Sequence, residues 1–276
     1  MSLLVFCVIL FSASLHAVWN AIVKGGRNTL LTTILVAGSA AAVGIVALPF
    51  LPPIAAAAWP YLAVSAVLEI AYYTLVAGAY RHADMSRAYP LMRGTPPLLV
   101  ALVSSLALGM ALSLTGWIGI ALVSAGLLSL TFGGAGGNPR GIQFAMVNAL
   151  VIASYTLVDG FGVRASGSPI AYTMWIFVLT GAPLTAWAFL RRPEFLRYAR
   201  GNWHLGLAGG LGTLISYGLV LWSMTMAPIA LVAALRETSI LFGTLIAVLV
   251  LKERVTRTRL VAVLIIAAGA IVLKLA

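Results

Sequence analysis

The sequence predicts an all-α integral membrane protein with ten transmembrane helices, arranged as two inverted repeats of five helices each. Three observations support this prediction. The chain of 276 residues is 62% hydrophobic and only 8% charged, which leaves too little polar surface to cover a water-soluble domain. Apolar runs long enough to cross a membrane, roughly 20 residues each, recur along the whole chain. Residues 88–129 also resemble residues 231–272, which indicates an internal duplication.

The apolar runs are continuous and do not alternate with polar residues, so helices rather than β-strands must satisfy the backbone. In chain order the predicted spans are 3–23, 30–50, 59–80, 88–108, 113–131, 141–163, 169–190, 204–226, 229–251 and 256–274.

The duplication is visible as pairs of matching residues. Upstream of residue 88 the alignment between the two copies shifts by one residue. The pairs include Arg93 with Arg236, Gly126 with Gly269, Tyr73 with Tyr217 and Ala83 with Ala227. Each copy holds an odd number of predicted spans. The second copy must therefore enter the membrane upside down relative to the first, as in many secondary transporters.

A glycine-rich segment at residues 133–140 separates the two copies and predicts a flexible linker. The first five-span repeat is expected to cover residues 1–132 and the second residues 141–276. We expect no soluble domain beside them.

A net charge of +11 would suggest a nucleic-acid partner in a soluble protein, but here its position along the chain explains it. Cationic residues gather in the connections after odd-numbered spans: Lys24, Arg27, Arg81, Arg87, Arg140, Arg191, Arg192, Arg197, Arg200, Lys252, Arg254, Arg257 and Arg259. The opposite side keeps only Arg164 and Lys274. The positive-inside rule then places these residues in the cytoplasm and predicts that both termini lie outside it, and no nucleic-acid partner is expected.

An alternative interpretation treats the first span as a cleaved signal peptide, because Ser14-Leu15-His16-Ala17 resembles a small-residue cleavage site. The charged segment that precedes such a peptide is missing, and removal would leave the two repeats unequal. Cys7, the single cysteine, supports neither a disulfide nor a thiolate metal site.

Five charged residues fall at membrane depth: Glu69, Arg93, Asp159, Arg236 and Glu237. Each costs at least about 2.5 to 3.5 kcal/mol at a helix centre unless it is paired or faces a wet cavity. We therefore expect them to converge on the interior. Asp159 lies near the outer end of its span, where water could solvate it.

Glu69 shares a helical face with Tyr73, beside Tyr72, and its counterpart in the second copy is the uncharged Thr213. Because burial disfavours a charged carboxylate, Glu69 is the first candidate for proton coupling, with Glu237 as the second. The alternative is a fixed ion pair between Glu69 and Arg93.

Arg93 precedes Pro96 and Pro97, which remove backbone hydrogen bonds, so the fourth span is predicted to be kinked or broken beside this arginine. The alternative is an ordinary proline kink with Arg93 reaching to the membrane surface. Arg236 and Glu237 are immediate neighbours that point about 100° apart on a helix, so each needs a partner on another helix. Two arginines flanking a midplane site suit a substrate with a carboxylate.

Polar and aromatic residues on the first, sixth and eighth spans complete the predicted site. The full set of predicted substrate-binding residues is His16, Trp19, Asn20, Glu69, Tyr72, Tyr73, Arg93, Asn148, Tyr155, Tyr217, Arg236 and Glu237. Metalloprotease, hydrolase and phosphate-loop motifs are missing from the sequence. We therefore expect no catalytic site, no cofactor and no bound metal.

Three sequence motifs resemble the EamA-type permeases of the drug/metabolite transporter superfamily. They are Leu15-His16-Ala17-Val18-Trp19-Asn20, Ala88-Tyr89-Pro90-Leu91-Met92-Arg93-Gly94 and Ala234-Leu235-Arg236-Glu237-Thr238-Ser239, with Leu251-Lys252-Glu253-Arg254 closing the ninth span. The resemblance implies a basket of ten helices around a central cavity, lined mainly by spans one, three, four, six, eight and nine. It also implies a structural role for Glu253. Many relatives place their termini in the cytoplasm, whereas the charge pattern here predicts the opposite.

Together with the resemblance, these features predict an alternating-access exporter in the bacterial inner membrane. It would export small zwitterionic solutes such as amino acids, be coupled to protons and work as a monomer or weak homodimer. One alternative is an exchanger of organic anions or phosphorylated metabolites, since paired arginines also suit phosphate. A second alternative is a non-transporting membrane partner or lipid-handling subunit, which would have a dry interior.

Overall fold

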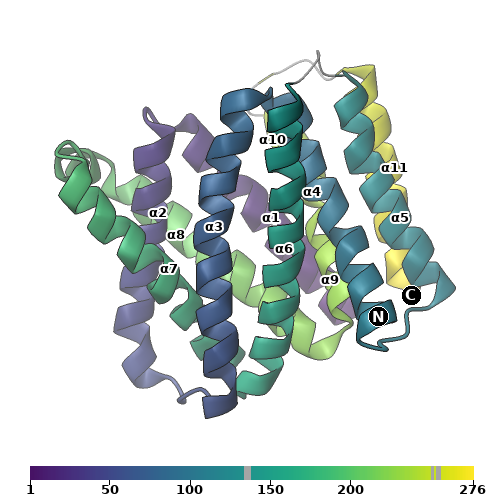
Figure 1. Ribbon diagram of the computed structural model, residues 1–276, viewed down its shortest axis with the longest axis horizontal. Coiled ribbons are helices and arrows are strands. Elements are labelled where there is room, and N and C mark those ends of the chain that lie inside the picture. Colours follow the sequence, from purple (N-terminus) through teal and green to yellow (C-terminus); the bar gives the residue numbers. More distant parts are fainter. Residues whose placement is uncertain (134–137, 250–251, 253–255) are drawn as a thin grey trace.

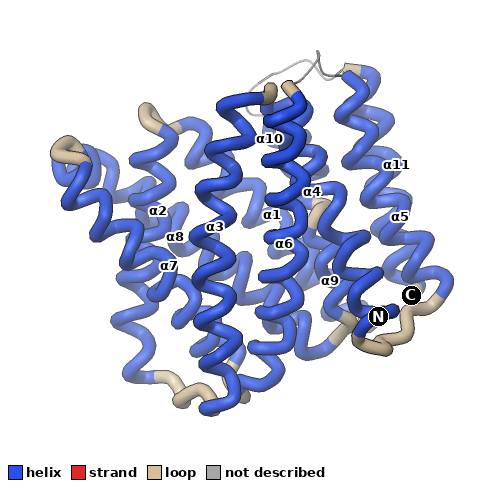
Figure 2. The backbone as a smooth tube through the Cα atoms, in the orientation of Figure 1, coloured by secondary structure: helices blue, strands red, loops and turns tan. Residues whose placement is uncertain are grey.

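The computed structural model describes residues 1–133, 138–249, 252 and 256–276, so Glu253 and the centre of the predicted linker lie outside the described residues. Within the described part the chain is a bundle of helices without β-strands (Figure 2). The two ends of the chain lie at the same end of the bundle (Figure 1), where the Lys274 Nζ lies 3.5 Å from the Met1 carbonyl oxygen.

The first half of the chain forms α1 (Leu3–Gly25), α2 (Thr29–Ala47), α3 (Trp59–His82), α4 (Met85–Leu102) and α5 (Leu114–Ser129). The second half forms α6 (Pro139–Ser166), α7 (Pro169–Arg191), α8 (Phe195–Met226), α9 (Ile229–Arg236), α10 (Ser239–Leu249) and α11 (Arg257–Leu275). Four short helical turns, η1 (Leu48–Phe50), η2 (Ala56–Ala58), η3 (Val103–Ala107) and η4 (Leu130–Gly133), lie in or beside connections.

Several helices begin where a polar side chain accepts a hydrogen bond from the first turn, which satisfies an otherwise unpaired N–H group. The capping residues are Ser2, Asn28, Ser113, Asn138, Ser168 and Thr256. At the other end of α6, Gly167 takes a left-handed conformation with φ of +69°, and the chain turns there into α7.

Eight helical segments of the described chain are long and apolar enough to cross a membrane, and Ile229–Leu249, which contains α9 and α10, is one of them. The remaining two predicted spans are helices as well, but they fall short of this standard. α4 carries Arg93 and three prolines, and α5 has only 16 residues. The multi-pass membrane fold is therefore confirmed, whereas the count of ten spans and their inverted arrangement stay predictions.

Helices from the two halves pack against one another across the whole bundle. α1 packs on α8 and α3 on α6, while α2 packs on α7 and α5 on α11. Glycines permit the last of these contacts, because a Cβ at Gly126 would lie 3.0 Å from the Ala262 carbonyl oxygen and one at Gly269 would lie 2.9 Å from the Val123 nitrogen. The two glycines are the pair that the sequence comparison aligned.

Two details of the predicted spans need correction. The connection expected at residues 191–203 is largely helical, because α8 begins at Phe195 and bends at Asn202, where φ is −128° and ψ is 18°. Phe195 is buried and its ring lies 5.2 Å from that of Phe189, which anchors this added length of helix.

The predicted break beside Arg93 was also wrong. α4 runs without interruption through Pro90, Pro96 and Pro97. The interruption lies instead in the second half, between α9 and α10, where Glu237 and Thr238 donate backbone hydrogen bonds to residues three positions earlier. A tight turn thus replaces one turn of α-helix immediately after Arg236.

Candidate functional site

A cavity of about 150 Å³ lies between helices of both halves. It is lined by residues of α1 (His16, Trp19, Asn20), α3 (Glu69, Tyr72, Tyr73), α4 (Tyr89, Arg93), α6 (Tyr155), α7 (Phe177), α8 (Thr213, Ser216, Tyr217, Val220) and α9 (Arg236). Helices from far apart in the sequence therefore supply one polar and aromatic lining.

The cavity brings together ten of the twelve predicted binding residues. Asn148 and Glu237, the other two, do not line it. Asn148 is fully buried between α6 and α4, where its Nδ2 lies 3.1 Å from the Met92 sulfur. Glu237 lies in the turn between α9 and α10 and reaches Arg93.

Arg93 and Glu237 form an ion pair, with 2.9 Å between the Nε and Oε2 atoms. The contact is close enough for strong attraction but lacks the alignment of a hydrogen bond. Both side chains are less than a tenth exposed, so little solvent screens the pair. The expected alternative partner of Arg93, Glu69, is therefore not the carboxylate that holds it.

Two buried donors on the cavity wall have no hydrogen-bond acceptor in the described part of the protein. They are the Nη2 group of Arg93 and the indole Nε1 of Trp19. Both nitrogen atoms are shielded from solvent in this conformation, and each N–H can only donate, so an acceptor such as a carboxylate oxygen would satisfy them once it reaches them. These donors are the clearest mark of a ligand site in the structure.

Arg236 has a different environment from its repeat partner. Its guanidinium carbon lies 5.7 Å from the centre of the Tyr217 ring, and its Nη2 lies 3.5 Å from the Tyr155 hydroxyl. The ring face attracts the cation and holds it against the cavity without neutralising its charge.

Asp159 is the charged residue whose position differs most from the expected one. It is fully buried, and each carboxylate oxygen accepts one hydroxyl: Oδ1 from Tyr172 at 3.2 Å and Oδ2 from Tyr217 at 2.5 Å. The expectation of water at this position was wrong. Asp159 lies behind the cavity wall, and Tyr217 contacts it from the cavity side.

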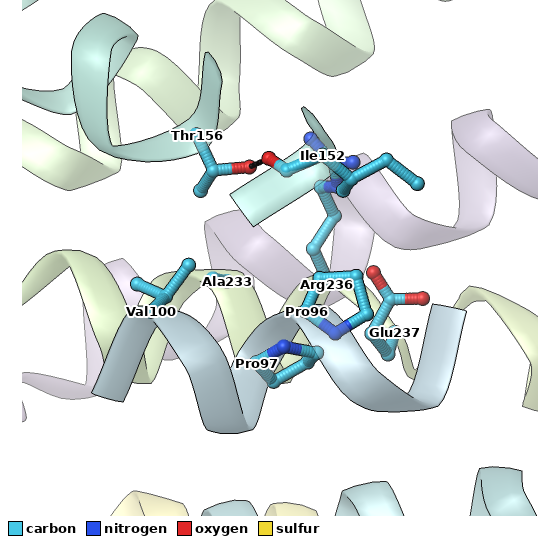
Figure 3. A pocket seen from close by; sticks show the side chains of 8 residues that line it. All are labelled: Pro96, Pro97, Val100, Ile152, Thr156, Ala233, Arg236 and Glu237. Atoms are coloured by element: carbon cyan, nitrogen blue, oxygen red, sulfur yellow. Dashed lines mark hydrogen bonds between the residues drawn. The ribbon is translucent and has the colours of Figure 1, made fainter. Parts of the chain in front are cut away.

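A second, much smaller cavity of about 10 Å³ lies where α4, α6 and α9 meet (Figure 3). Pro96 and Pro97 line it together with Arg236 and Glu237. It has room for about one water molecule. The proline pair therefore faces the interrupted helix of the second half across this space.

Five of the lining residues are not among those predicted from the sequence. Tyr89 lies near a predicted span end, a position typical of aromatic residues at the membrane surface. Thr213 and Val220 lie four residues before and three residues after Tyr217, and Ser216 lies three residues after Thr213, a spacing that was available from the sequence. Phe177 carried no signal, because an apolar ring on an apolar span is unremarkable.

Comparison with known proteins identifies a family for about half of the chain and a similar fold for nearly all of it. Residues 139–275 match the model of the EamA-like transporter family. A solved structure, described only as the crystal structure of a protein, matches 99% of this chain and 96% of its own, with a TM-score of 0.75 at 20% sequence identity. That similarity establishes the fold alone. No curated protein matches the chain.

The cavity, the membrane-spanning helices and the family match point to the same class of protein. Members of this family are transporters rather than enzymes, which agrees with the missing catalytic motifs. Residues 139–275 are an EamA-like transporter family domain, of the kind found in the drug/metabolite transporter superfamily.

Proposed function

We propose that this protein is a secondary transporter that works by alternating access and exports small zwitterionic metabolites, most simply amino acids. The observation that carries the proposal is the mixed charge of the cavity lining. Arg93 and Arg236 can hold a carboxylate, while Glu69 can hold an ammonium group. One small cavity thus offers complementary charge to both ends of a zwitterion.

The volume of the cavity limits the size of the solute. At about 150 Å³ it is smaller than the roughly 300 to 1,000 Å³ of drug-sized ligand sites and similar to a cavity that binds benzene. Aromatic rings from Tyr72, Tyr73, Tyr155 and Tyr217 supply contact for an apolar side chain. Small amino acids suit this space in the present state of the protein.

Packing between the halves supports the repeat on which alternating access depends. In the repeat, α1, α2, α3 and α5 of the first half correspond to α6, α7, α8 and α11 of the second. The contact of α1 with α8 therefore corresponds to the contact of α6 with α3. The contacts of α2 with α7 and of α5 with α11 each join two corresponding helices. Such exchange symmetry is expected when two related halves rock about a shared central site.

A thermal-shift screen of the purified protein in detergent tests the proposal. The panel contains free amino acids of increasing size and, as rivals, phosphorylated metabolites. A ligand at 100 times its Kd stabilises the folded protein by about 2.7 kcal/mol. We expect small amino acids to raise the melting temperature, and radiolabelled hits to leave preloaded liposomes that contain the protein.

The double variant Arg93→Gln with Glu237→Gln, which leaves no unpaired buried charge, is compared in this screen with Arg200→Gln, because Arg200 is exposed and away from the cavity. Loss of the response only in the double variant would support the carboxylate site. Stabilisation by phosphate esters in preference to amino acids would replace the proposal by the organic-anion alternative. No response to any solute would count against transport of these classes.

A further inference from the structure

The α7–α8 corner, residues 187–203, carries four arginines close together in the sequence. Arg191 and Arg192 lie at the end of α7, and Arg197 and Arg200 lie in the first two turns of α8. Among the described residues, no carboxylate lies within ion-pair distance of any of the four, not even that of the neighbouring Glu194. Like charges held close together repel one another, so the corner suits a partner with negative charge.

Two of these arginines are placed unfavourably for their own helix. The N-terminus of an α-helix carries partial positive charge, which acidic residues stabilise and basic residues oppose. The first turn of α8 has no acidic residue, and Glu194 before it makes no capping hydrogen bond. Arg197 and Arg200 add two positive charges there. Arg191 lies instead in the last turn of α7, where a cation is favourable. Helix stability therefore explains the arginines of α7 but not those of α8.

The segment that carries Arg197 and Arg200 is fixed to the bundle by packing. Phe195 is buried in a cluster that includes apolar residues of α2. The Tyr198 hydroxyl oxygen lies 2.6 Å from the Thr32 hydroxyl oxygen, also on α2. Arg197 and Arg200 are three residues apart, so they share a helical face, and both are exposed. Two guanidinium groups thus extend outward from a fixed backbone.

Large apolar side chains beside the arginines are exposed as well. They are Trp187 and Leu190 on α7 and Leu196 and Trp203 on α8. The guanidinium carbon of Arg192 lies 5.5 Å from the centre of the Trp187 ring. The corner lies at the left edge of the bundle in Figure 1. In membrane proteins, tryptophan near the ends of spans lies at the depth of the lipid head groups. The corner therefore combines positive charge with apolar surface at that depth.

We propose that the α7–α8 corner binds the head group of an anionic phospholipid, with Arg197 and Arg200 as its main contacts. Guanidinium groups bind phosphate oxygens through paired N–H donors, and clusters of basic residues beside a membrane span are typical of anionic lipid sites. Leu190 and Leu196 are available to contact the acyl chains, which a soluble phosphate lacks. None of the four arginines lines the cavity, so the inference does not depend on the proposed transport function, and a solute screen in lipid-free detergent does not test it.

Native mass spectrometry of the whole protein in detergent micelles tests this inference by titration with phosphatidylglycerol, phosphatidylcholine and soluble glycerol 1-phosphate. We expect phosphatidylglycerol to bind more tightly than the other two. The double variant Arg197→Gln with Arg200→Gln should weaken that binding by about thirtyfold, or about fivefold for each arginine. The matched double variant Arg81→Gln with Arg87→Gln removes two charges near the connection of α3 with α4 and should leave the binding nearly unchanged.

Equal losses in the two double variants would overturn the inference, because they would show diffuse attraction to a cationic surface. Binding of phosphatidylcholine or of glycerol 1-phosphate as tight as that of phosphatidylglycerol would overturn it too. A misfolded variant would also lose the lipid, so the melting temperature in lipid-free detergent is the second measurement. Arg197→Gln with Arg200→Gln should not lower it, because the change removes two charges that oppose the helix dipole. A clear fall would assign these arginines a structural role instead.

Discussion

Arg93 and Arg236 occupy equivalent positions in the two halves of the chain, yet they are held in different ways. Arg93 projects from an uninterrupted helix and meets Glu237 at 2.9 Å. Arg236 ends α9 at a tight turn and lies over the face of Tyr217. Both halves thus place a guanidinium group in one cavity. Arg93 is neutralised by a carboxylate, whereas Arg236 lies against an aromatic ring that leaves its charge uncompensated.

The ion pair of Arg93 gives the largest expected effect. Removing one partner of a buried pair leaves an uncompensated charge and costs about 3 to 5 kcal/mol. Glu237→Gln should therefore lower the melting temperature in detergent strongly. The double variant Arg93→Gln with Glu237→Gln should recover most of the loss, and an equally unstable double variant would show that the pair is not the cause.

Tyr217 makes two separable contributions, a hydrogen bond from its hydroxyl to Asp159 and a ring face that holds Arg236. Tyr217→Phe keeps the ring but removes the hydroxyl that Asp159 accepts, a loss of about 1.5 to 3 kcal/mol for a hydrogen bond to a charged group. Tyr217→Leu also removes the ring face, at about 0.5 to 2 kcal/mol more. Equal melting temperatures for the two variants would contradict a role for the ring face.

The smallest effect is expected for Pro97→Ala on α4. Alanine restores an N–H group that can reach the Arg93 carbonyl one turn away, a hydrogen bond worth about 1 kcal/mol. The helix already continues through this position, so the melting temperature should rise slightly. A clear fall would mean that the proline ring is needed where it lines the small cavity beside Arg236.

Much of the site could be predicted because charge at membrane depth is costly wherever the fold places it. This reasoning identified Glu69, Arg93 and Arg236 before any helix was positioned, and all three line the cavity. The helices could be predicted from the lengths of the apolar runs. The ion-pair partner of Arg93 could not be predicted, because two carboxylates were candidates and only packing in three dimensions selects Glu237.

The errors share a physical origin in tertiary contacts that override local rules. Proline removes a hydrogen bond in any helix, yet neighbouring helices hold α4 in one piece, while α9 ends without any proline. Asp159 was placed by its distance along a span, whereas its hydroxyl partners come from α7 and α8. The sequence offered one hint, since Tyr155 and Asp159 share a helical face four residues apart.

Among the described residues, the Nη2 group of Arg93 and the indole Nε1 of Trp19 have no hydrogen-bond acceptor, which has a consequence for discrimination between closely similar molecules. A decarboxylated amine would fill nearly the same space as the parent amino acid but would leave both donors without an acceptor. A site that hydrogen-bonds a particular group of its ligand discriminates strongly against analogues without that group. A site that selects by size alone discriminates much less. On the proposed function, the protein would therefore retain amines inside the cell while releasing the acids from which they derive.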